Sequence, residues 1–475
     1  MFINGKWVEA ANGGRFDVLN PADGSVISAV PDGGADDAQR AILAADGALD
    51  SWSRTTAYQR ADILREAHRL MLERKEDLAR TMTEEQGKPL RAARIEVQYG
   101  ADFLLWFAEE AKRINGEILP SARADQRFMV LHQPVGVVAA ITPWNYPISM
   151  ITRKVGPALA AGCTVVLKPA EATPLCAIAM FRIFEEAGVP PGVVNLVTAA
   201  DPVPIGEAFT SHPAIAKLTF TGSTAVGRML AAEASGRMKR VSMELGGHAP
   251  FIVCKDADPV HAAKGGSLVK FLNTGQACIS PNRFFVHGSI YEPFVETLTA
   301  RVEKMKAGSG FEDGVSIGPL VNATAVQKVD RQVQDARAKG AEVLAGGAAL
   351  TDGSLGSGHF YAPTVLAGVT RDMLIYREET FGPVAPVIRY DDDDDVLAMA
   401  NDTEYGLAAY VYTRDLSRAM HLFEGLRFGI IGINDINPTS AAAPFGGMKS
   451  SGLGREGARE GIEEYLETKL GGFSI

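Results

Sequence analysis

The sequence predicts an α/β protein in which a doubly wound parallel sheet is joined to a second α/β block. The first observation is an alternation of apolar, strand-like runs with helix-like runs, which begins near residue 128. The second is the length of 475 residues, which exceeds what one hydrophobic core normally supports. The third is the glycine pair at 246–247, where the chain can hinge between the two blocks.

The expected elements follow from hydrophobic periodicity and turn signals. Residues 1–30 indicate a hairpin-like lead-in, and residues 36–115 indicate packing helices. Strands are then predicted over 135–142, 163–168, 193–197, 215–220 and 240–244, with helices over 148–159, 173–187 and 223–233. The second block is predicted to start with a strand at 250–253, a helix at 260–272 and a strand at 283–286. Residues 128–132 and the tail after 457 fit neither sheet.

The composition limits the classes of function. Lys and Arg number 47 against 57 Asp and Glu, and the net charge of −10 argues against nucleic acid as the main partner. There is no apolar run of about 18 residues to span a membrane and no leader-like start. The four cysteines are scattered, with no His at metal-ligand spacing. We expect a cytoplasmic protein with reduced thiols and no metal, and a solvated turn at the acidic run 391–395.

Four positions fall at or just after the ends of predicted strands, namely Asn145, Lys168, Gly222 and Glu244. In doubly wound sheets, ligands bind beyond the carboxyl ends of the strands. Because these ends meet at one edge of the sheet, the four positions predict a single site there.

Three stretches carry a resemblance to a known family: Thr142–Pro147, Met243–Pro250 and Phe271–Ser280. Together they resemble the aldehyde dehydrogenase superfamily, and the resemblance covers nearly the whole chain. It implies the aldehyde dehydrogenase fold, with a doubly wound Rossmann-like cofactor domain, an α/β catalytic domain and a small oligomerisation hairpin and tail. The implied bounds are 1–115 and 136–246 for the NAD-binding domain, 247–445 for the catalytic domain, and 116–135 and 446–475 for the oligomerisation elements. A homo-oligomer, either a dimer or a tetramer, is also implied.

The resemblance assigns the chemistry to three residues. Cys278 is the expected nucleophile, because a thiolate that attacks an aldehyde forms a thiohemiacetal able to release hydride. Asn145 is the expected donor to the developing oxyanion, a contact worth about 3 kcal/mol in other enzymes, although an Asn there could instead cap the following helix. Glu244 is the expected general base for thioester hydrolysis. The other cysteines lie in apolar runs and are read as core residues: Cys163, Cys176 and Cys254.

The implied cofactor is NAD, with NADP as the alternative. Gly222, Ser223 and Gly227 stand at a strand-to-helix turn, and a helix N-terminus suits a pyrophosphate. In the family, the lysine at the position of Lys168 contacts the adenosine ribose. A carboxylate at Glu171 would accept ribose hydroxyls and repel a 2′-phosphate, which favours NAD, although some relatives with Glu here use both cofactors. The remaining implied contacts are Glu379 to the nicotinamide ribose, Phe381 against the ring, and Trp144 and Leu245 in the lining.

Within the superfamily, residues 150–154, 401–409, 443–447 and 451–457 are most similar to succinate-semialdehyde dehydrogenases, and two other strings are shared with α-ketoglutarate-semialdehyde dehydrogenases. Arg153 is expected to clamp an anionic substrate tail, or alternatively to form a surface ion pair. Semialdehyde members carry an Arg where this chain has Leu272, which should weaken binding of a plain carboxylate. Thr439 and Ser440 are candidate hydroxyl donors in its place, and Arg283 is a further candidate cation.

The expected substrate is therefore a short aldehyde with an anionic tail, such as succinate semialdehyde. Sulfolactaldehyde, glutarate semialdehyde and α-ketoglutarate semialdehyde remain alternatives. An acylating enzyme that passes the thioester to coenzyme A is disfavoured by Glu244, because such members generally lack that base. A catalytically silent binding or structural protein is disfavoured because the proposed nucleophile, base, oxyanion donor and cofactor lysine are all present.

Overall fold

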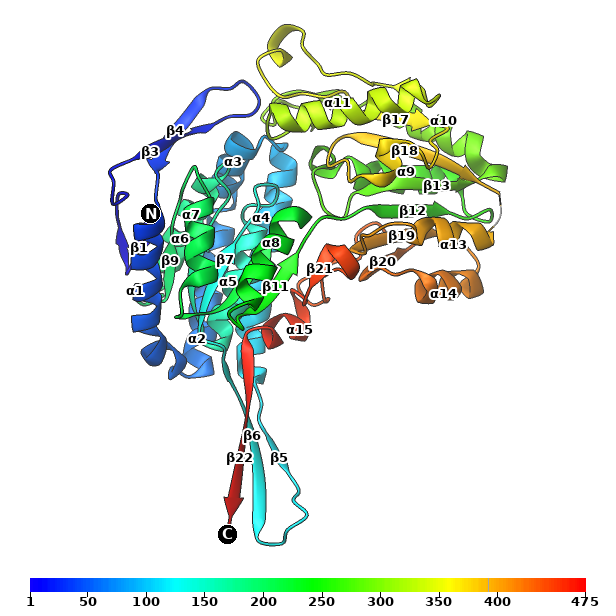
Figure 1. The fold of residues 1–475 in the computed structure, drawn as a ribbon. Helices are drawn as coiled ribbons and strands as arrows, with labels where there is room; N and C mark the ends of the chain where they lie inside the picture. Colours follow the sequence, from blue (N-terminus) through cyan, green and yellow to red (C-terminus); the bar gives the residue numbers. More distant parts are fainter. Residues whose placement is uncertain (392) are drawn as a thin grey trace.

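The computed structural model describes the whole chain except residue 392 and the side chains of residues 393–395. The acidic run at 391–395, predicted to be a solvated turn, therefore falls mostly outside the described residues. Two large sheets, each covered by helices, make up the body, and a narrow three-stranded sheet projects away from it (Figure 1). The α/β class predicted from the sequence is confirmed.

The first sheet has eight strands, of which five run parallel in the order β9-β8-β7-β10-β11. These five are the strands predicted from periodicity. Strands β1 and β21, from opposite ends of the chain, pair antiparallel at the two sides of this group, so the sheet is mixed and not purely parallel. The strands are β1 (Phe2–Ile3), β2 (Lys6–Trp7), β7 (Val137–Ile141), β8 (Thr164–Lys168), β9 (Val194–Leu196), β10 (Ile215–Thr221), β11 (Arg240–Glu244) and β21 (Gly452–Leu453).

Helices cover both faces of the first sheet. Along β7, Val137 and Ala139 pack into one core while Val138 and Ala140 pack into the other, since successive strand residues point to opposite faces. The core with Val137 holds α1 (Ala35–Ser53), α7 (Val203–Ser211) and α8 (Thr224–Ser235). The core with Val138 holds α2 (Ala57–Glu73), α3 (Lys75–Gln86), α4 (Leu90–Glu110), α5 (Ser149–Ala161) and α6 (Pro174–Glu186). Of these helices, α7 has no counterpart in the sequence prediction.

Every residue of α5 is buried, as expected for a helix in the centre of a large core. Its neighbour α4 packs along it, and a Cβ on Gly156 would lie 3.3 Å from the ring of Phe107. Because Arg153 and Lys154 are carried into the interior with α5, each requires a buried counter-charge.

The second sheet has seven strands in the order β16-β17-β18-β13-β12-β19-β20, all parallel except β16 at the edge. Its strands are β12 (Ala249–Val253), β13 (Pro281–His287), β16 (Glu342–Ala345), β17 (Thr364–Ala367), β18 (Val384–Tyr390), β19 (Ala408–Tyr412) and β20 (Ile430–Ile433). The helices beside it are α9 (Pro259–Lys270), α10 (Tyr291–Val302), α11 (Ala323–Ala338), α12 (Leu374–Arg377), α13 (Asp393–Asn401) and α14 (Leu416–Gly425).

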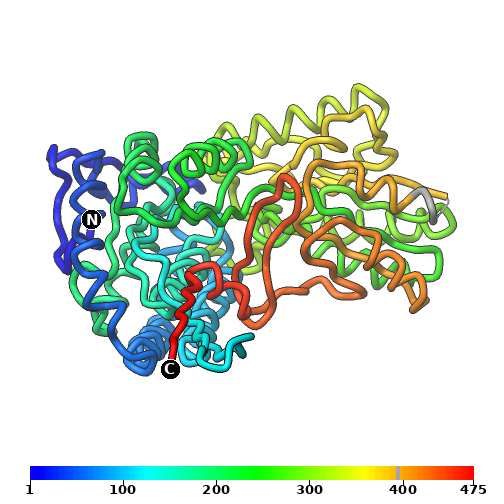
Figure 2. Tube along the Cα trace, turned by 60° about the horizontal axis from the view of Figure 1, so that its bottom comes forward, coloured from blue at the N-terminus to red at the C-terminus, as the bar shows by residue number. Residues whose placement is uncertain are grey.

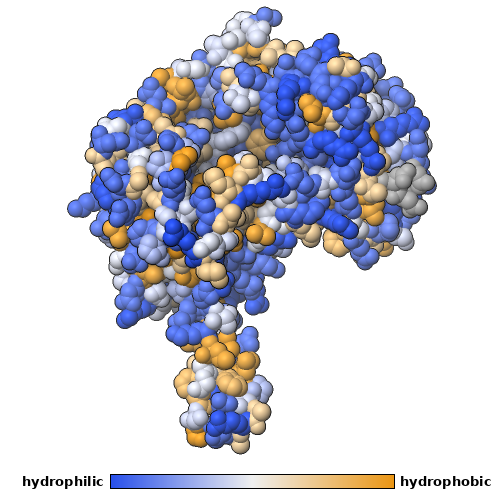
Figure 3. Space-filling view, in the orientation of Figure 1, coloured by the Kyte–Doolittle hydropathy of each residue, from blue (hydrophilic) through white to orange (hydrophobic). Residues whose placement is uncertain are grey.

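The projecting sheet accounts for the segments that fitted neither large sheet. It consists of β5 (Glu117–Leu119), β6 (Gln126–Pro134) and β22 (Leu466–Ser474), all antiparallel. Before it reaches this sheet, the C-terminal segment runs between the two halves of the body (Figure 2), contributes β21 to the first sheet and forms α15 (Ala458–Glu463). Apolar side chains are exposed along the projection (Figure 3), namely Ile118, Leu119, Met129, Leu131, Leu470 and Phe473.

Two small pairs complete the fold. Strands β3 (Arg15–Leu19) and β4 (Val26–Pro31) form the predicted N-terminal hairpin, and β14 (Lys306–Ala307) pairs with β15 (Val315–Ile317). Within the part of the chain that the structure describes, no helix combines the length and apolar character needed to cross a membrane.

Candidate active site

Cys278 lies between α9 and β13 in a loop with an unusual backbone. Asn273 and Thr274 adopt φ of 50° and 60°, in the left-handed region that costs energy for non-glycine residues. Side-chain hydrogen bonds hold this conformation: Thr274 Oγ1 accepts from the Gly318 N–H at 2.9 Å, and Asn273 Nδ2 donates to the Asn145 carbonyl at 3.0 Å. Contacts from other segments therefore fix the loop that carries Cys278.

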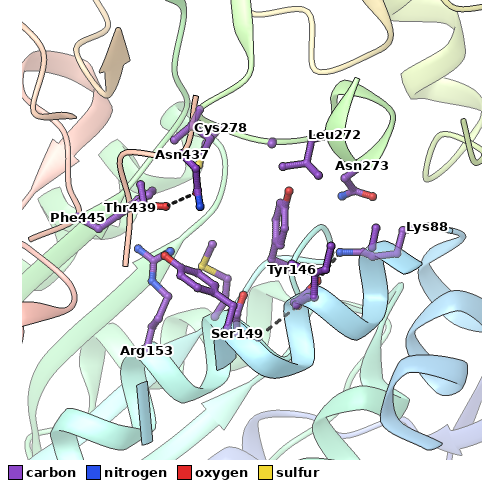
Figure 4. Close-up of a pocket in the computed structure, with 17 residues that line it drawn as sticks. Lys88, Tyr146, Ser149, Arg153, Leu272, Asn273, Cys278, Asn437, Thr439 and Phe445 are labelled. Carbon is purple, nitrogen blue, oxygen red and sulfur yellow. Dashed lines mark hydrogen bonds and ion pairs between the residues drawn. The ribbon is translucent and has the colours of Figure 1, made fainter. Parts of the chain in front are cut away.

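Two pockets meet at Cys278, whose side chain is partly exposed. Figure 4 shows the first pocket, where side chains of α5, the Cys278 loop and the segment around Asn437 converge. The polar residues lining the first pocket are Lys88, Glu96, Tyr99, Tyr146, Ser149, Arg153, Asn273, Asn437 and Thr439. The second pocket is lined by Trp144, Asn145, Thr221, Gly222, Ser223, Leu245, Lys328, Glu379, Thr380 and Phe381, among others. A molecule in either pocket can therefore reach the same sulfur atom.

The surroundings of Cys278 favour the protonated thiol over the thiolate. Burial raises its pKa to about 12; the Arg153 guanidinium opposes this rise and the Glu244 carboxylate adds to it. Only the thiolate is strongly nucleophilic. The other three cysteines are fully buried and line neither pocket.

Asn145 follows β7 and is buried beside the Cys278 loop. Its Nδ2 donates to the Gln276 carbonyl at 3.0 Å, which holds the amide plane against that loop. An amide nitrogen has two N–H groups, and Asn145 lines the second pocket together with Cys278. Helix α5 begins four residues later and has no side-chain cap from Asn145. The helix-capping alternative is therefore not the role that the structure shows.

Glu244 ends β11, and its two carboxylate oxygens are buried without a hydrogen-bond partner. Burial raises its pKa well above the usual range; the neighbouring Glu456 carboxylate adds to the rise and Arg153 opposes it. Gly446 leaves room for this side chain, because a Cβ there would lie 2.9 Å from Glu244 Oε1. A buried carboxyl group with a raised pKa and unused oxygens is suited to accept a proton from water.

The second pocket combines unpartnered hydroxyl groups, two aromatic rings and a carboxylate in its lining. Thr221 Oγ1 and Thr380 Oγ1 are both buried there without a hydrogen-bond partner, so a bound ligand could form hydrogen bonds with them. The rings of Trp144 and Phe381 lie 5.6 Å apart, edge to face, at its wall. Glu379 accepts a hydrogen bond from the Gly247 N–H at 2.8 Å and stays partly accessible.

The turn after β10 brings the N-terminus of α8 to the second pocket. Ser223 caps this helix by accepting from the Val226 N–H at 3.4 Å. Gly227 lets the helix approach the pocket floor, because a Cβ there would lie 2.2 Å from Leu245 Cδ2. Gly222 is bonded through its N–H to the Glu244 carbonyl at 3.1 Å. The predicted strand-to-helix turn therefore brings a helix N-terminus to the second pocket.

Lys168 and Glu171 lie together at the end of β8. Lys168 is buried, and its Nζ donates to the Pro169 carbonyl at 3.0 Å and lies 3.4 Å from Glu171 Oε2. The side chain of Glu171 is 52% exposed, so its carboxylate is free to meet a ribose. Neither residue lines the second pocket itself.

Arg153 is a buried cation in the lining of the first pocket, and it is not on the surface. Its Nη2 lies 2.7 Å from Glu456 Oε2, and its guanidinium lies over the ring of Phe445 at 3.9 Å. Arg153 Nε has no hydrogen-bond partner. One turn earlier on the same helix face, Ser149 Oγ is also buried without a partner. Two adjacent donors are thus unsatisfied in the lining of the first pocket.

The structure does not place every proposed substrate residue in the pocket. The guanidinium of Arg283 is buried in the second half of the molecule and donates to the carbonyls of His248, Met399 and Ala400, so Arg283 does not meet a substrate tail. Its position inside a central strand, β13, accounts for this. Thr439 lines the first pocket, whereas the exposed Ser440 does not. Leu272, at the position where the resemblance implies an Arg, lines the first pocket.

Several lining residues escaped the motif analysis. Ser149, Asn437 and Tyr146 each bring a polar group to the first pocket. Tyr146 could have been predicted, because it directly follows Asn145 in the sequence. Asn437 could not, because it lies in a loop with no recognisable motif. Among the described residues, no group of three or more His, Cys, Asp or Glu side chains is placed to hold a metal ion.

Comparisons with known proteins agree with this geometry. The family model for the aldehyde dehydrogenase family matches residues 7–470. The chain is 51% identical to the NADP(+) succinate-semialdehyde dehydrogenase of Escherichia coli (strain K12), over 98% of this chain and 96% of that protein. It is 50% identical to a 3-sulfolactaldehyde dehydrogenase of Pseudomonas putida, over 99% of this chain and 96% of that protein. The protein in a crystal structure of succinate-semialdehyde dehydrogenase from Burkholderia pseudomallei is 48% identical to this chain. The two structures match with a TM-score of 0.98, over 100% of this chain and 97% of that one. The chain therefore belongs to the aldehyde dehydrogenase family, as an NAD(P)-dependent enzyme similar to the succinate-semialdehyde dehydrogenases.

Proposed function

We propose that this enzyme oxidises a short aldehyde with an anionic tail to the corresponding carboxylic acid. The observation that supports this most is the position of Cys278, which lines both pockets at once. The first pocket brings Arg153 towards a substrate tail, and the second has the lining of a nicotinamide site. The aldehyde carbon is then held at the sulfur, between its tail and the hydride acceptor.

The first step is addition of the Cys278 thiolate to the aldehyde carbon. A carbon–sulfur bond forms, and the carbonyl π-electrons move to oxygen. The Asn145 side-chain amide and the main-chain N–H of Cys278 donate to that oxyanion, and one such donor is worth about 3 kcal/mol in comparable sites. The thiol proton must leave first. It passes to solvent, because Cys278 is partly exposed, so this step does not require Glu244.

Cofactor binding is assigned to the second pocket and the edge of the first sheet. A nicotinamide cofactor held there would supply the hydride acceptor, and the thiohemiacetal on Cys278 would become a thioester by losing hydride. Glu379 and Phe381 hold the nicotinamide end, Ser223 and the N-terminus of α8 hold the phosphates, and Lys168 and Glu171 hold the adenosine ribose. Glu171 places a carboxylate where NADP carries a phosphate, which favours NAD.

Hydrolysis of the thioester completes the cycle. Glu244, in its deprotonated form, removes a proton from water as the water oxygen attacks the thioester carbon. The carbon–sulfur bond breaks, the acid leaves, and the sulfur is restored as a thiolate. An acylating enzyme would instead pass the acyl group to coenzyme A and would not need this base.

The anionic tail is assigned to α5. Arg153 Nε and Ser149 Oγ are unpartnered donors one helical turn apart, and a carboxylate or sulfonate oxygen would satisfy them. Leu272 supplies no charge, so the site has one cation fewer than semialdehyde relatives with Arg there. Thr439 and Asn437 add neutral donors. Succinate semialdehyde and sulfolactaldehyde both fit this chemistry, as substrates that the two curated relatives are named for.

The domain roles and the cellular location extend the same proposal. The first sheet is assigned to the cofactor and the second, carrying Cys278, to catalysis. Four cysteines that are expected to be reduced suit the cytoplasm.

The proposal is tested by trapping the acyl-enzyme. Glu244→Gln protein is mixed with NAD and succinate semialdehyde or sulfolactaldehyde, and its intact mass is measured. We expect a mass increase equal to the acyl group, located on the peptide that contains Cys278, together with one equivalent of NADH. The Cys278→Ala/Glu244→Gln protein serves as the control and gains no mass. NADH formed without any adduct in the Glu244→Gln protein would contradict the covalent route.

A further inference from the structure

Lys88 and Glu96 form an ion pair buried at the back of the first pocket. Each side chain is 1% exposed, and both residues line the pocket. Lys88 lies in the short link between α3 and α4, and Glu96 lies on α4, two turns further on. A buried ion pair is weak evidence for stability, because the desolvation of two charges offsets most of their attraction. The contacts of this pair therefore decide what it does.

Lys88 holds the backbone of the proposed oxyanion donor. Its Nζ pairs with Glu96 Oε2 and also donates to the main-chain carbonyl of Asn145 at 2.7 Å. The same ammonium lies 4.2 Å from the ring centre of Tyr146, the next residue. Figure 4 shows the Lys88 amine on the side of the pocket that faces Tyr146 and Asn273.

Glu96 holds the other end of the same segment. Its Oε1 accepts hydrogen bonds from the main-chain N–H groups of Ile148 at 3.0 Å and Ser149 at 3.2 Å. These N–H groups belong to the start of α5, where a carboxylate also interacts favourably with the helix dipole. The ion pair thus forms hydrogen bonds with the main chain at both ends of residues 145–149.

The Asn145 carbonyl is also the point where this segment meets the Cys278 loop. Asn273 Nδ2 donates to it at 3.0 Å, so Lys88 and Asn273 share one acceptor. The Asn145 side chain in turn donates to the Gln276 carbonyl, two residues before the nucleophile. A displacement of the carbonyl would be passed directly to the spacing between the Asn145 amide and Cys278.

The support beneath Lys88 is itself rigid. The Leu90 N–H donates to the Gly310 carbonyl at 2.9 Å. A Cβ on Gly310 would lie 2.5 Å from the Lys88 carbonyl, so the two backbones are in direct contact. Lys88 is therefore anchored to the half of the molecule that carries Cys278, while its ammonium reaches the strand end that carries Asn145.

We propose that the Lys88–Glu96 ion pair is a positioning element that sets the Asn145 amide relative to Cys278 for addition to the aldehyde carbonyl. This inference rests on the proposed function, in which Asn145 stabilises the oxyanion. Errors of about 1 Å in such a donor cost rate because the contact must match the transition state closely. Lys88 and Glu96 touch neither the reacting carbon nor the sulfur in this account, so they act only through Asn145.

The test is a double-mutant cycle between Lys88 and Asn145. The variants are Lys88→Met, Asn145→Ala and the double variant, each with acetaldehyde, because an uncharged substrate removes any effect of the pocket charge on a tail. The first readout is the single-turnover rate of NADH formation at saturating cofactor. The second is alkylation of Cys278 by iodoacetamide, a displacement at saturated carbon that forms no oxyanion. Lys217→Met is the matched control, since Lys217 is a buried lysine that pairs with Glu464 and lines neither pocket.

We expect Lys88→Met to slow NADH formation about 10- to 100-fold and to leave alkylation within about twofold of the wild-type rate. In the Asn145→Ala background, Lys88→Met should have almost no further effect, because residues that act as a unit are not additive. Lys217→Met should lower the melting temperature without changing either rate. Rescue of the NADH rate by Lys88→Arg would support the same positioning role.

Three outcomes are distinguishable. Additive effects of Lys88→Met and Asn145→Ala, or an unchanged NADH rate in Lys88→Met, would overturn the positioning role alone. A fully active Asn145→Ala protein would instead remove the oxyanion donor from the proposed function. If Lys88→Met fails to fold, the cycle is run with Glu96→Gln, which keeps the size of the side chain and weakens the same contacts; additivity there overturns the proposal equally.

Discussion

The main-chain carbonyl of Cys278 lies against Gly247: a Cβ on this glycine would be 2.3 Å from the Cys278 oxygen. The hinge that separates the two blocks in the sequence is thus also the surface on which the nucleophile loop rests. Gly247 also donates its N–H to Glu379. One glycine therefore joins the nucleophile to the carboxylate assigned to the cofactor.

Gly247→Ala is predicted to displace the Cys278 loop. We expect kcat/KM to fall at least about 100-fold, since small errors in reacting geometry carry large costs, with a loss of stability of about 1–3 kcal/mol from the overpacked contact. Gly47→Ala is the control, because this glycine lies in α1 with nothing within 4 Å of its Cβ. The Gly47→Ala protein should gain about 0.5–1 kcal/mol in free energy of unfolding, because Ala has a higher helix propensity than Gly. Wild-type activity in Gly247→Ala would show that the loop tolerates the shift.

The pH dependence of hydrolysis should report Glu244. Burial raises its pKa well above the usual carboxyl range, so the carboxylate that acts on water is gained only as pH rises through that raised pKa. In stopped-flow experiments, we expect thioester hydrolysis to slow towards acid pH. The Glu244→Gln protein should be slow throughout and lack this dependence. A wild-type rate that does not vary between about pH 5 and pH 8 would contradict the role of Glu244 as general base.

The pH dependence of alkylation should report Cys278 in the free enzyme. Because burial raises its pKa to about 12, the thiolate fraction should rise about tenfold per pH unit from about pH 7 to about pH 9. Iodoacetamide labelling measured by mass spectrometry gives this rate directly. Arg153→Met should raise the pKa further and slow labelling at fixed pH, since the guanidinium favours the thiolate. A rate that bends towards a plateau at about pH 8.5 to 9 would show a thiol of ordinary pKa.

Leu272→Arg should restore the cation that semialdehyde relatives carry. We expect KM for succinate semialdehyde to fall about tenfold, corresponding to one charge-assisted hydrogen bond, while KM for acetaldehyde changes little. Leu272→Gln provides a control of similar polarity without charge. If both variants behave alike with succinate semialdehyde, charge at this position does not govern recognition of the tail.

Much of the fold was predictable, because the periodicity of apolar residues along the sequence indicates where strands and helices lie. The five parallel strands of the first sheet and the helices after Asn145 and Ser223 lie within a few residues of the predicted bounds. The antiparallel edges were not predictable, because β1 and β21 are only two residues long and join the sheet from opposite ends of the chain. Their pairing depends on tertiary contacts and leaves no local pattern.

The candidate site divides in the same way. Local motifs with Gly and polar residues at strand ends predicted Cys278, Glu244 and Asn145. Cys278 lines both pockets and Asn145 lines the second. Glu244 lines neither, but it is buried close enough to Arg153 and Cys278 to interact with both. The sequence could not give the orientation of Arg283, because burial of its guanidinium among carbonyls depends on the packing around α13. Nor could it give the Lys88–Glu96 pair, whose meaning comes from contacts to residues more than 50 positions away.

The measurement that tests the central claim most directly is NADH formation by the purified protein across a panel of aldehydes. The panel holds succinate semialdehyde, glutarate semialdehyde, α-ketoglutarate semialdehyde, sulfolactaldehyde, acetaldehyde and benzaldehyde, each with NAD and with NADP. We predict the highest kcat/KM for anionic aldehydes with NAD, abolished in Cys278→Ala and reduced about 10- to 100-fold in Arg153→Met through the lost charged contact. A preference for acetaldehyde or benzaldehyde that Arg153→Met leaves unchanged would contradict the account.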